Sequence, residues 1–173
     1  ASHKKIAIVA HQKTSSLQEA LFNNAYGIPA GKLGSELLVE SKEHLAKMYP
    51  HIQQIGSEKV IAIQEQPSHF TVVTTKNSYT TKIVVVGIGS ANTFAIEGLM
   101  HYVEPNRKSL PEKERIQLKN TDHKVAEGIY VIGTLAGWRS QLAIAAGSGA
   151  AVATDILTLW NNGVQTHSHD SIR

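Results

Sequence analysis

The sequence predicts an α/β fold with three layers and a small antiparallel β-meander, and three observations support this prediction. Two apolar runs, at residues 83–86 and 129–132, each lead into glycine, as buried strands of a parallel sheet do. Shorter β-like runs precede the first of them and are joined by turn residues, which is typical of a meander. A loop and a long apolar helix follow the second run.

The first fifty residues predict one strand and one long helix. Residues 5–10 form a short apolar run that predicts a buried strand, and residues 14–24 are compatible with either a short helix or a loop. A helix is expected over residues 30–48, because Pro29 suits a first helical turn and Pro50 prevents continuation.

The middle of the chain predicts strands at four places: residues 51–55, 59–64, 69–75 and 79–86. Alternation in the third predicts one solvated face, and the apolar end of the fourth predicts burial on both faces. A short helix is expected within residues 92–103 and a loop over residues 104–120, which carry two prolines.

The last helix contains Gly147 and Gly149, each of which costs about 1 kcal/mol relative to alanine in a helix interior. Two such glycines predict that another backbone passes close to the helix. Strand, loop and closely packed helix together predict a place where a ligand meets a helix N-terminus.

This C-terminal stretch resembles the final flavin-binding segment of the thioredoxin-reductase-like pyridine nucleotide-disulfide oxidoreductases. In that family a strand ends in Gly-Asp, and the helix that follows opens with Gln and continues through Ala-Gly-x-Gly. Gly133, Gln141 and residues 146–149 match this pattern, whereas Thr134 stands where the family has Asp. The helix after Gly27-Ile28-Pro29, the meander and the glycine-ended strand have counterparts in the same order, so the resemblance covers most of residues 5–160.

The resemblance implies an FAD/NAD(P)-binding-like fold and an FAD site without catalytic side chains of its own. Gly133 and Thr134 would approach the ribityl chain, and the start of the last helix would approach the ring and stabilise negative charge on reduced flavin. The implied cofactor-binding residues are Gly87, Gly89, Gly133, Thr134, Ser140, Gln141 and Leu142.

Several parts of the family are missing from the sequence. The first strand is followed by no Gly-x-Gly-x-x-Gly, and residues 86–92 run straight past the point where the family inserts its NADPH domain. The chain has no cysteine and therefore no redox-active dithiol. Because the missing strand is central in the family's sheet, we expect a rearranged sheet or a strand borrowed in a homodimer.

Two functional hypotheses follow. In the first, the chain is a thioredoxin-reductase-like FAD domain, an oxidoreductase relative that depends on an external redox partner. In the second, it is a non-catalytic remnant that acts as a dimerisation or protein-interaction module without cofactor. No Ser/His/Asp set or paired catalytic carboxylates can be nominated.

The remaining features predict a single truncated domain over residues 1–173, with a flexible tail at 162–173. The net charge of +3 is spread over interleaved charges, which argues against nucleic-acid binding. His167 and His169 are too few ligands for a structural metal site. No apolar run reaches about 20 residues without interruption, and the start is polar. We therefore expect a cytoplasmic protein without a membrane span. Because of the missing strand, we also expect a homo-oligomer.

Overall fold

The computed structural model describes residues 4–11 and 16–166. These residues form two α-helices, α1 (Gly34–Met48) and α2 (Leu142–Trp160), and three short 3-10 segments, η1 (Met100–Tyr102), η2 (Pro111–Lys113) and η3 (Gly133–Ala136). The strands in chain order are β1 (Ile6–Val9), β2 (Leu21–Phe22), β3 (Lys32–Leu33), β4 (Ile52–Ile55), β5 (Val60–Gln66), β6 (His69–Thr74), β7 (Ser78–Thr81), β8 (Val84–Val86), β9 (Val103–Pro105), β10 (Ile116–Leu118), β11 (Lys124–Ala126) and β12 (Ile129–Val131).

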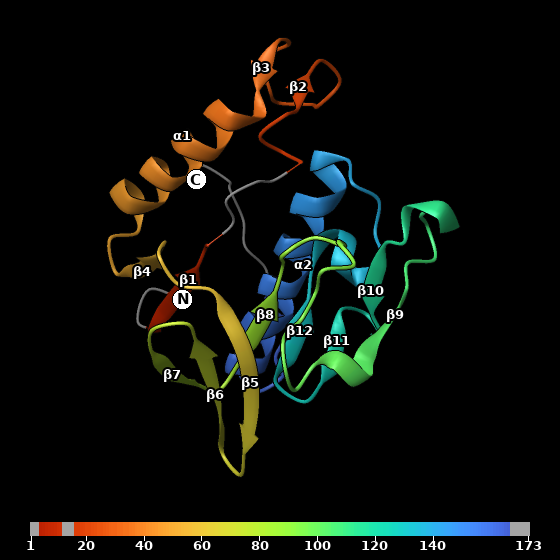
Figure 1. Ribbon diagram of the computed structural model, residues 1–173. Helices are drawn as coiled ribbons and strands as arrows, with labels where there is room; N and C mark the ends of the chain where they lie inside the picture. The colour runs from red at the N-terminus through yellow and green to blue at the C-terminus, as the bar shows by residue number, and fades with distance from the viewer. Residues whose placement is uncertain (1–3, 12–15, 167–173) are drawn as a thin grey trace.

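The strands are divided among five small sheets (Figure 1). β8 and β12 run parallel, and β11 joins the far side of β12 in antiparallel orientation. β5, β6 and β7 form the antiparallel meander that the sequence predicts. β1 and β4 are parallel and form a separate pair, and β9–β10 and β2–β3 are antiparallel pairs. The described strands therefore do not form one continuous sheet.

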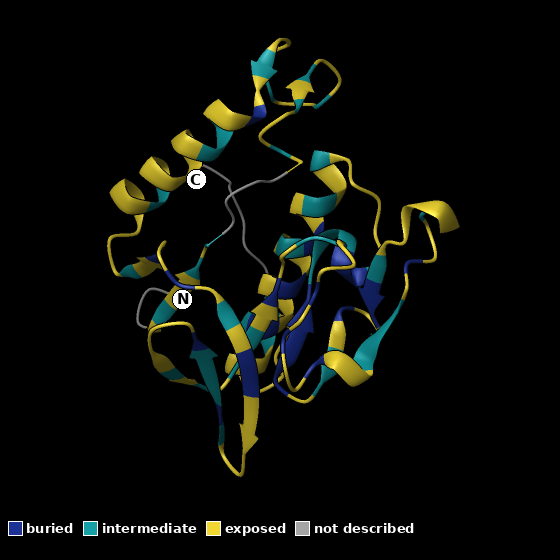
Figure 2. Cartoon of the chain, viewed as in Figure 1, coloured by how far each residue is buried: buried dark blue, intermediate teal, exposed yellow. Residues whose placement is uncertain are grey.

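The hydrophobic core lies between the meander, the β8–β12–β11 sheet and the β9–β10 pair (Figure 2). Leu99, Leu118, Val131 and Leu135 are fully inaccessible in this core. A second cluster joins α2 to β12 through Tyr130, Val152 and Ile156. These contacts bury β12 and one face of α2, which the sequence predicts as a strand and a helix.

Residues 4–55, which we call the N-terminal lobe, are packed much less closely. Only Gly34 and Ile55 are buried among its described residues. Neither core cluster includes a residue of the lobe. Leu17 and Gln18 aside, every hydrogen bond of its described residues stays within the lobe, and its one ring contact outside is Lys4 over Trp160.

The helix predicted over residues 30–48 begins later than expected. Lys32–Leu33 instead form β3, which pairs with β2, and α1 starts at Gly34. Gly31 adopts φ +83°, and its N–H donates to the Phe22 carbonyl at 2.8 Å, so the chain turns before it can become helical. The prediction that Pro29 opens the helix is wrong, whereas the end of α1 at Met48, just before Pro50, is confirmed.

The other differences concern short elements. The described part of residues 14–24 contains turn and strand β2 but no helix, and residues 92–103 contain only the 3-10 segment η1. Residues 104–120, expected as loop, include most of the β9–β10 pair. The elements in these segments are only two or three residues long, too short to produce a periodic pattern in the sequence.

The expected strand over residues 79–86 is two strands, β7 and β8, which belong to different sheets. Burial of its apolar end on both faces is also not observed. Val86 is 5% exposed, but Val85 is 43% exposed. Successive side chains point to opposite faces: Val86 faces the main core together with Val131, whereas Val85 faces the other side and is not part of either core cluster.

Candidate functional site

Four of the predicted cofactor residues follow the carboxyl ends of the parallel strands β8 and β12. The other three lie at the start of α2. Because β8 and β12 are parallel, their carboxyl ends meet at the same edge, where Gly87 and Gly89 follow one strand and Gly133 follows the other. Ligands bind at this edge in open α/β sheets. The structure thus brings together residues that are more than forty positions apart in the sequence.

The glycines at this edge have different structural roles. Gly89 and Gly133 adopt φ +82° and +65°, which favour glycine. A Cβ on Gly133 would meet nothing closer than the Ala145 Cβ at 3.9 Å, so space beside it is open. A Cβ on Gly87 would lie 2.8 Å from Ile132 Cγ1, so Gly87 is required by packing against the next strand.

Ser148 fixes α2 to the end of β12. The Gly133 N–H donates to Ser148 Oγ at 2.6 Å, and the serine is 6% exposed. The sequence interpretation placed Ser148 in the helix without giving it a role. A hydroxyl group at a buried position of an apolar helix was the signal that would have identified it.

The N-terminus of α2 opens beside this hydrogen bond. Gln141 is the residue before the helix, its carbonyl accepts the Ala145 N–H at 3.0 Å, and no side chain caps the first turn. The N–H groups of the first turn therefore lack helical partners, and the helix dipole favours negative charge there. Ser140 and Gln141 are exposed and Leu142 is half-buried at this end.

Hydrogen bonds to the Thr134 carbonyl hold the loop between β12 and α2 in place. The Thr134 carbonyl accepts from Asn106 Nδ2 at 3.0 Å and from the Gly137 N–H at 3.1 Å. Gln117, 4% exposed, lies beneath Gly137, where an added Cβ would be 2.6 Å from its Oε1. The backbone of the loop is thereby fixed, while the side-chain hydroxyl of Thr134 has no partner among the described residues.

Trp138 lies at the rim of the loop and is 43% exposed. Its ring stacks on His123 with 5.8 Å between centroids, and Lys108 Nζ lies 4.4 Å from the ring centre. His123 Nδ1 donates to the Val131 carbonyl at 2.9 Å, so the imidazole is anchored to β12. These contacts show that the Trp138 ring packs on the protein.

The prediction that a backbone passes close to Gly147 and Gly149 is wrong for the described residues. A Cβ on Gly147 would meet open space, and one on Gly149 would make an ordinary 3.7 Å contact with Ile132. The buried residues of α2 are Ser148, Val152 and Ile156, so Gly147 faces away from the sheet. Gly147 thus lies on the open outer face of the helix, and neither glycine is required by a tight contact.

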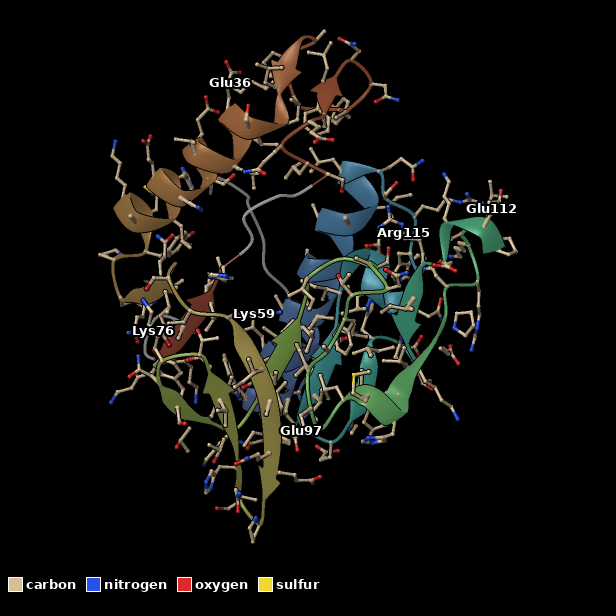
Figure 3. The ribbon with its side chains drawn as sticks, viewed as in Figure 1. Glu36, Lys59, Lys76, Glu97, Glu112 and Arg115 are labelled. Atoms are coloured by element: carbon tan, nitrogen blue, oxygen red, sulfur yellow. The ribbon has the colours of Figure 1, made fainter. Side chains whose placement is uncertain are left out.

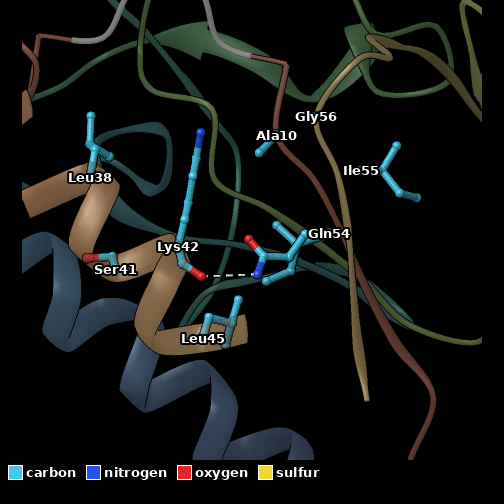
Figure 4. Close-up of a pocket in the computed structure, with 9 residues that line it drawn as sticks. Ala10, Leu38, Ser41, Lys42, Leu45, Gln54, Ile55 and Gly56 are labelled. Atoms are coloured by element: carbon cyan, nitrogen blue, oxygen red, sulfur yellow. Dashed lines mark hydrogen bonds between the residues drawn. The ribbon is translucent and has the colours of Figure 1, made fainter. Parts of the chain in front are cut away.

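A recess of about 350 Å³ lies elsewhere, between α1 and the β1–β4 pair (Figure 4). Leu38 and Leu45 of α1 face Ala10, Gln54 and Gly56 across it. Gln54 Nε2 donates to the Lys42 carbonyl at 3.2 Å. None of the predicted cofactor residues lines this recess.

Glu58 forms a buried polar cluster at the start of the meander. Its carboxylate accepts from Thr74 Oγ1 at 2.6 Å, Asn77 Nδ2 at 2.7 Å and Tyr79 Oη at 3.0 Å. The hydrogen bond from Thr74 is the main cause that lowers the pKa of Glu58, while burial and Glu58 raise the pKa of Tyr79. All three donors lie at or beside the turn between β6 and β7, which indicates that Glu58 has a structural role there.

No group of three or more His, Asp or Glu side chains capable of holding a metal ion occurs in residues 4–11 and 16–166. His167 and His169 lie outside these ranges. α2 is long and apolar enough to cross a membrane by length and composition alone, with 17% of its apolar window buried, which by itself is weak support for a span.

No family model matches the sequence, and no curated protein is similar to it. Solved structures are similar in fold. A thioredoxin reductase from Gloeobacter violaceus gives a TM-score of 0.74 at 12% identity and covers 99% of this chain and 92% of that chain. A ferredoxin-flavin thioredoxin reductase from Clostridium acetobutylicum gives 0.68 at 14%, with coverage of 92% and 90%. An oxidoreductase from Agrobacterium tumefaciens gives 0.66 at 11%, with 92% of both chains covered.

These matches extend over 92–99% of this chain. The chain therefore has the fold of the flavin domain of thioredoxin-reductase-like oxidoreductases.

Proposed function

We propose that this chain is an FAD-binding redox domain whose electrons come from, and go to, other proteins. The observation that carries the proposal is the uncapped N-terminus of α2 beside Gly133, at the carboxyl edge of two parallel strands. A bound flavin supplies reversible hydride and electron transfer. The chain has no cysteine, so any disulfide chemistry must occur on a partner.

The residues at this edge fit a flavin. Open space at Gly133 allows close approach to its backbone, and the hydroxyl of Thr134 is free of partners among the described residues. Ser140 and Gln141 are exposed and have no side-chain hydrogen bond in the same ranges. We propose that Gly89, Gly133 and Thr134 hold the flavin from the strand ends, while Ser140, Gln141 and Leu142 position its ring near the α2 dipole.

An external donor is part of this proposal. One similar structure is named as a ferredoxin-flavin thioredoxin reductase, which supports the idea that a flavin domain of this fold receives electrons from a protein. The cytoplasmic location expected from the sequence belongs to the same proposal.

A titration of the purified protein with FAD tests this function. We expect saturable quenching of flavin fluorescence, and Gly133→Ala should weaken binding about tenfold, or about 1.4 kcal/mol, because the methyl group occupies the open space and φ +65° becomes strained. Gly31→Ala is the matched control, since Gly31 has φ +83° and an equally open surrounding but lies in the N-terminal lobe.

The control variant should bind FAD as the wild type does. Wild-type protein that is folded yet shows no saturable FAD binding would contradict the proposal and favour the alternative of a cofactor-free interaction module. Equal weakening by both glycine variants would show that the effect is general and not located at this site.

A further inference from the structure

The turn that ends α2 contains the sequence Asn162-Gly163. Both residues are exposed, and both adopt positive φ, +54° and +81°. Many helices end in this left-handed conformation, and glycine and asparagine are the residues that adopt it most readily. The Gly163 N–H donates to the Thr158 carbonyl at 2.9 Å, which closes the last turn of the helix. We call this arrangement of residues 158–163 the α2 cap.

An Asn-Gly pair can lose ammonia without an enzyme. The Gly163 nitrogen attacks the side-chain carbonyl carbon of Asn162 and forms a new N–C bond. The bond from that carbon to Nδ2 breaks, and ammonia leaves with the hydrogen of the Gly163 nitrogen. Water then opens the five-membered imide at either carbonyl, which gives aspartate or isoaspartate. Glycine permits the attack because it has no Cβ to shield its nitrogen.

Asn162 is the asparagine of this chain that is best placed for the reaction. No other asparagine in the sequence precedes glycine. Asn77 precedes serine, also a small residue, but its Nδ2 donates to Glu58 at 2.7 Å and its carbonyl accepts from Thr74 Oγ1 at 2.9 Å. The side chain of Asn162 has no hydrogen bond among the residues that the structure describes. Its amide is therefore open to attack.

Thr158 holds the cap in a conformation that does not react. The attack requires the Gly163 nitrogen to face the Asn162 side chain and to give up its hydrogen, which the N–H bonded to Thr158 cannot do. Thr158 Oγ1 also accepts the Thr166 N–H at 3.1 Å, so the chain that follows is tied to the same helical turn. Because helix ends open at small free energies, the reactive conformation is reached by fraying.

We propose that Asn162 is a site of spontaneous deamidation whose rate is set by opening of the α2 cap. The product carries negative charge at the carboxyl end of α2, where the helix dipole is itself negative, so the closed turn becomes less favourable. In isoaspartate the main chain is also one atom longer, which moves the Gly163 N–H out of register with Thr158. The conversion loosens α2 beside Trp160, the ring that Lys4 Nζ of the N-terminal lobe approaches to 5.2 Å.

Peptide mass spectrometry of the purified protein, incubated warm at neutral pH, follows the conversion of each asparagine to an acid. We expect Asn162 to convert first, and about tenfold more slowly in the folded protein than in the same chain unfolded in guanidinium chloride. In the unfolded chain, Gly163→Ala should slow the reaction, because its methyl group shields the nitrogen. Absence of conversion in the folded protein, earlier conversion of another asparagine, or equal rates in the folded and unfolded chains would overturn the proposal.

The Thr158 hydroxyl provides a matched comparison within the folded protein. Thr158→Val should speed the conversion about threefold, because the Thr166 N–H loses its acceptor and the cap opens more often. Thr154→Val is the control, since that hydroxyl lies one turn earlier and donates to the Ala150 carbonyl, away from the cap. Thr158→Ser keeps the hydroxyl and should retain the wild-type rate.

Circular dichroism establishes that each variant is folded. An unchanged rate in Thr158→Val, or equal acceleration in Thr154→Val, would exclude control by the α2 cap. If Thr158→Val does not fold, the comparison of folded and unfolded wild-type protein decides.

Discussion

Residues 60–160 and the N-terminal lobe contrast within one chain. The first region surrounds four leucine and valine side chains with no exposed surface, whereas only Gly34 and Ile55 are buried among the described residues of the lobe. Both regions contain a parallel strand pair and a helix of similar length. The difference teaches that two paired strands and a helix gain little stability until further elements pack against them.

The largest expected difference between the regions concerns packing. Leu118→Ala, at a position with 0% exposure, should lower the free energy of unfolding by about 2–5 kcal/mol through lost burial and the cavity left behind. Leu38→Ala, on the half-buried face of α1, should cost about 1 kcal/mol or less. Urea denaturation of both variants measures the contrast, and equal losses would show that the lobe is as well packed as the core.

A smaller effect is expected where α2 meets β12. Ser148→Ala leaves the partly buried Gly133 N–H without an acceptor and should cost about 1–3 kcal/mol. Thr154→Ala removes a hydroxyl that bonds the Ala150 carbonyl on the exposed side of the same helix, and should change stability by less than about 0.5 kcal/mol. Thermal unfolding separates the two, and similar melting temperatures would contradict the assigned role of Ser148.

The third prediction concerns acid. Since hydrogen bonds lower the folded-state pKa of Glu58, its contribution to stability is complete above its ordinary pKa and is lost as the pH falls through the lowered value. Glu58→Gln should therefore lower the melting temperature at neutral pH and flatten its decline below about pH 4. Glu112→Gln, at an exposed position on the outer edge of the molecule (Figure 3), should leave the wild-type profile unchanged. A profile for Glu58→Gln that is parallel to the wild type would exclude this role.

Much of the fold was predictable because local patterns and packing agree. β12 and α2 were expected from an apolar run and a long apolar helix, and the meander from its turn residues, whereas η3 lies in a segment expected as a loop. β3 and the β9–β10 pair were not predicted, because strands of two or three residues are too short to show alternation in the sequence. The break between β7 and β8 was missed because Ile83 to Val86 are apolar irrespective of which sheet each residue joins.

The residues of the candidate site could be predicted from the sequence, but the contacts that hold them in place could not. Gly87, Gly89 and Gly133 lie at one edge as the resemblance implies, and Gln141 precedes α2. The contacts of Ser148 with the Gly133 N–H and of Asn106 with the Thr134 carbonyl were not predicted, because buried polar residues acquire their partners from neighbours in space. The glycines of α2 were misinterpreted for the same reason.

Residues 56–59 are the only covalent connection between the lobe and the core, and Gly56 and Ser57 within it are exposed. Such a tether is a natural site for a protease, and a single cut there would divide the chain without removing a residue from either core cluster. The two pieces, produced separately and mixed, would then show whether the lobe stays on the core when no peptide bond joins them.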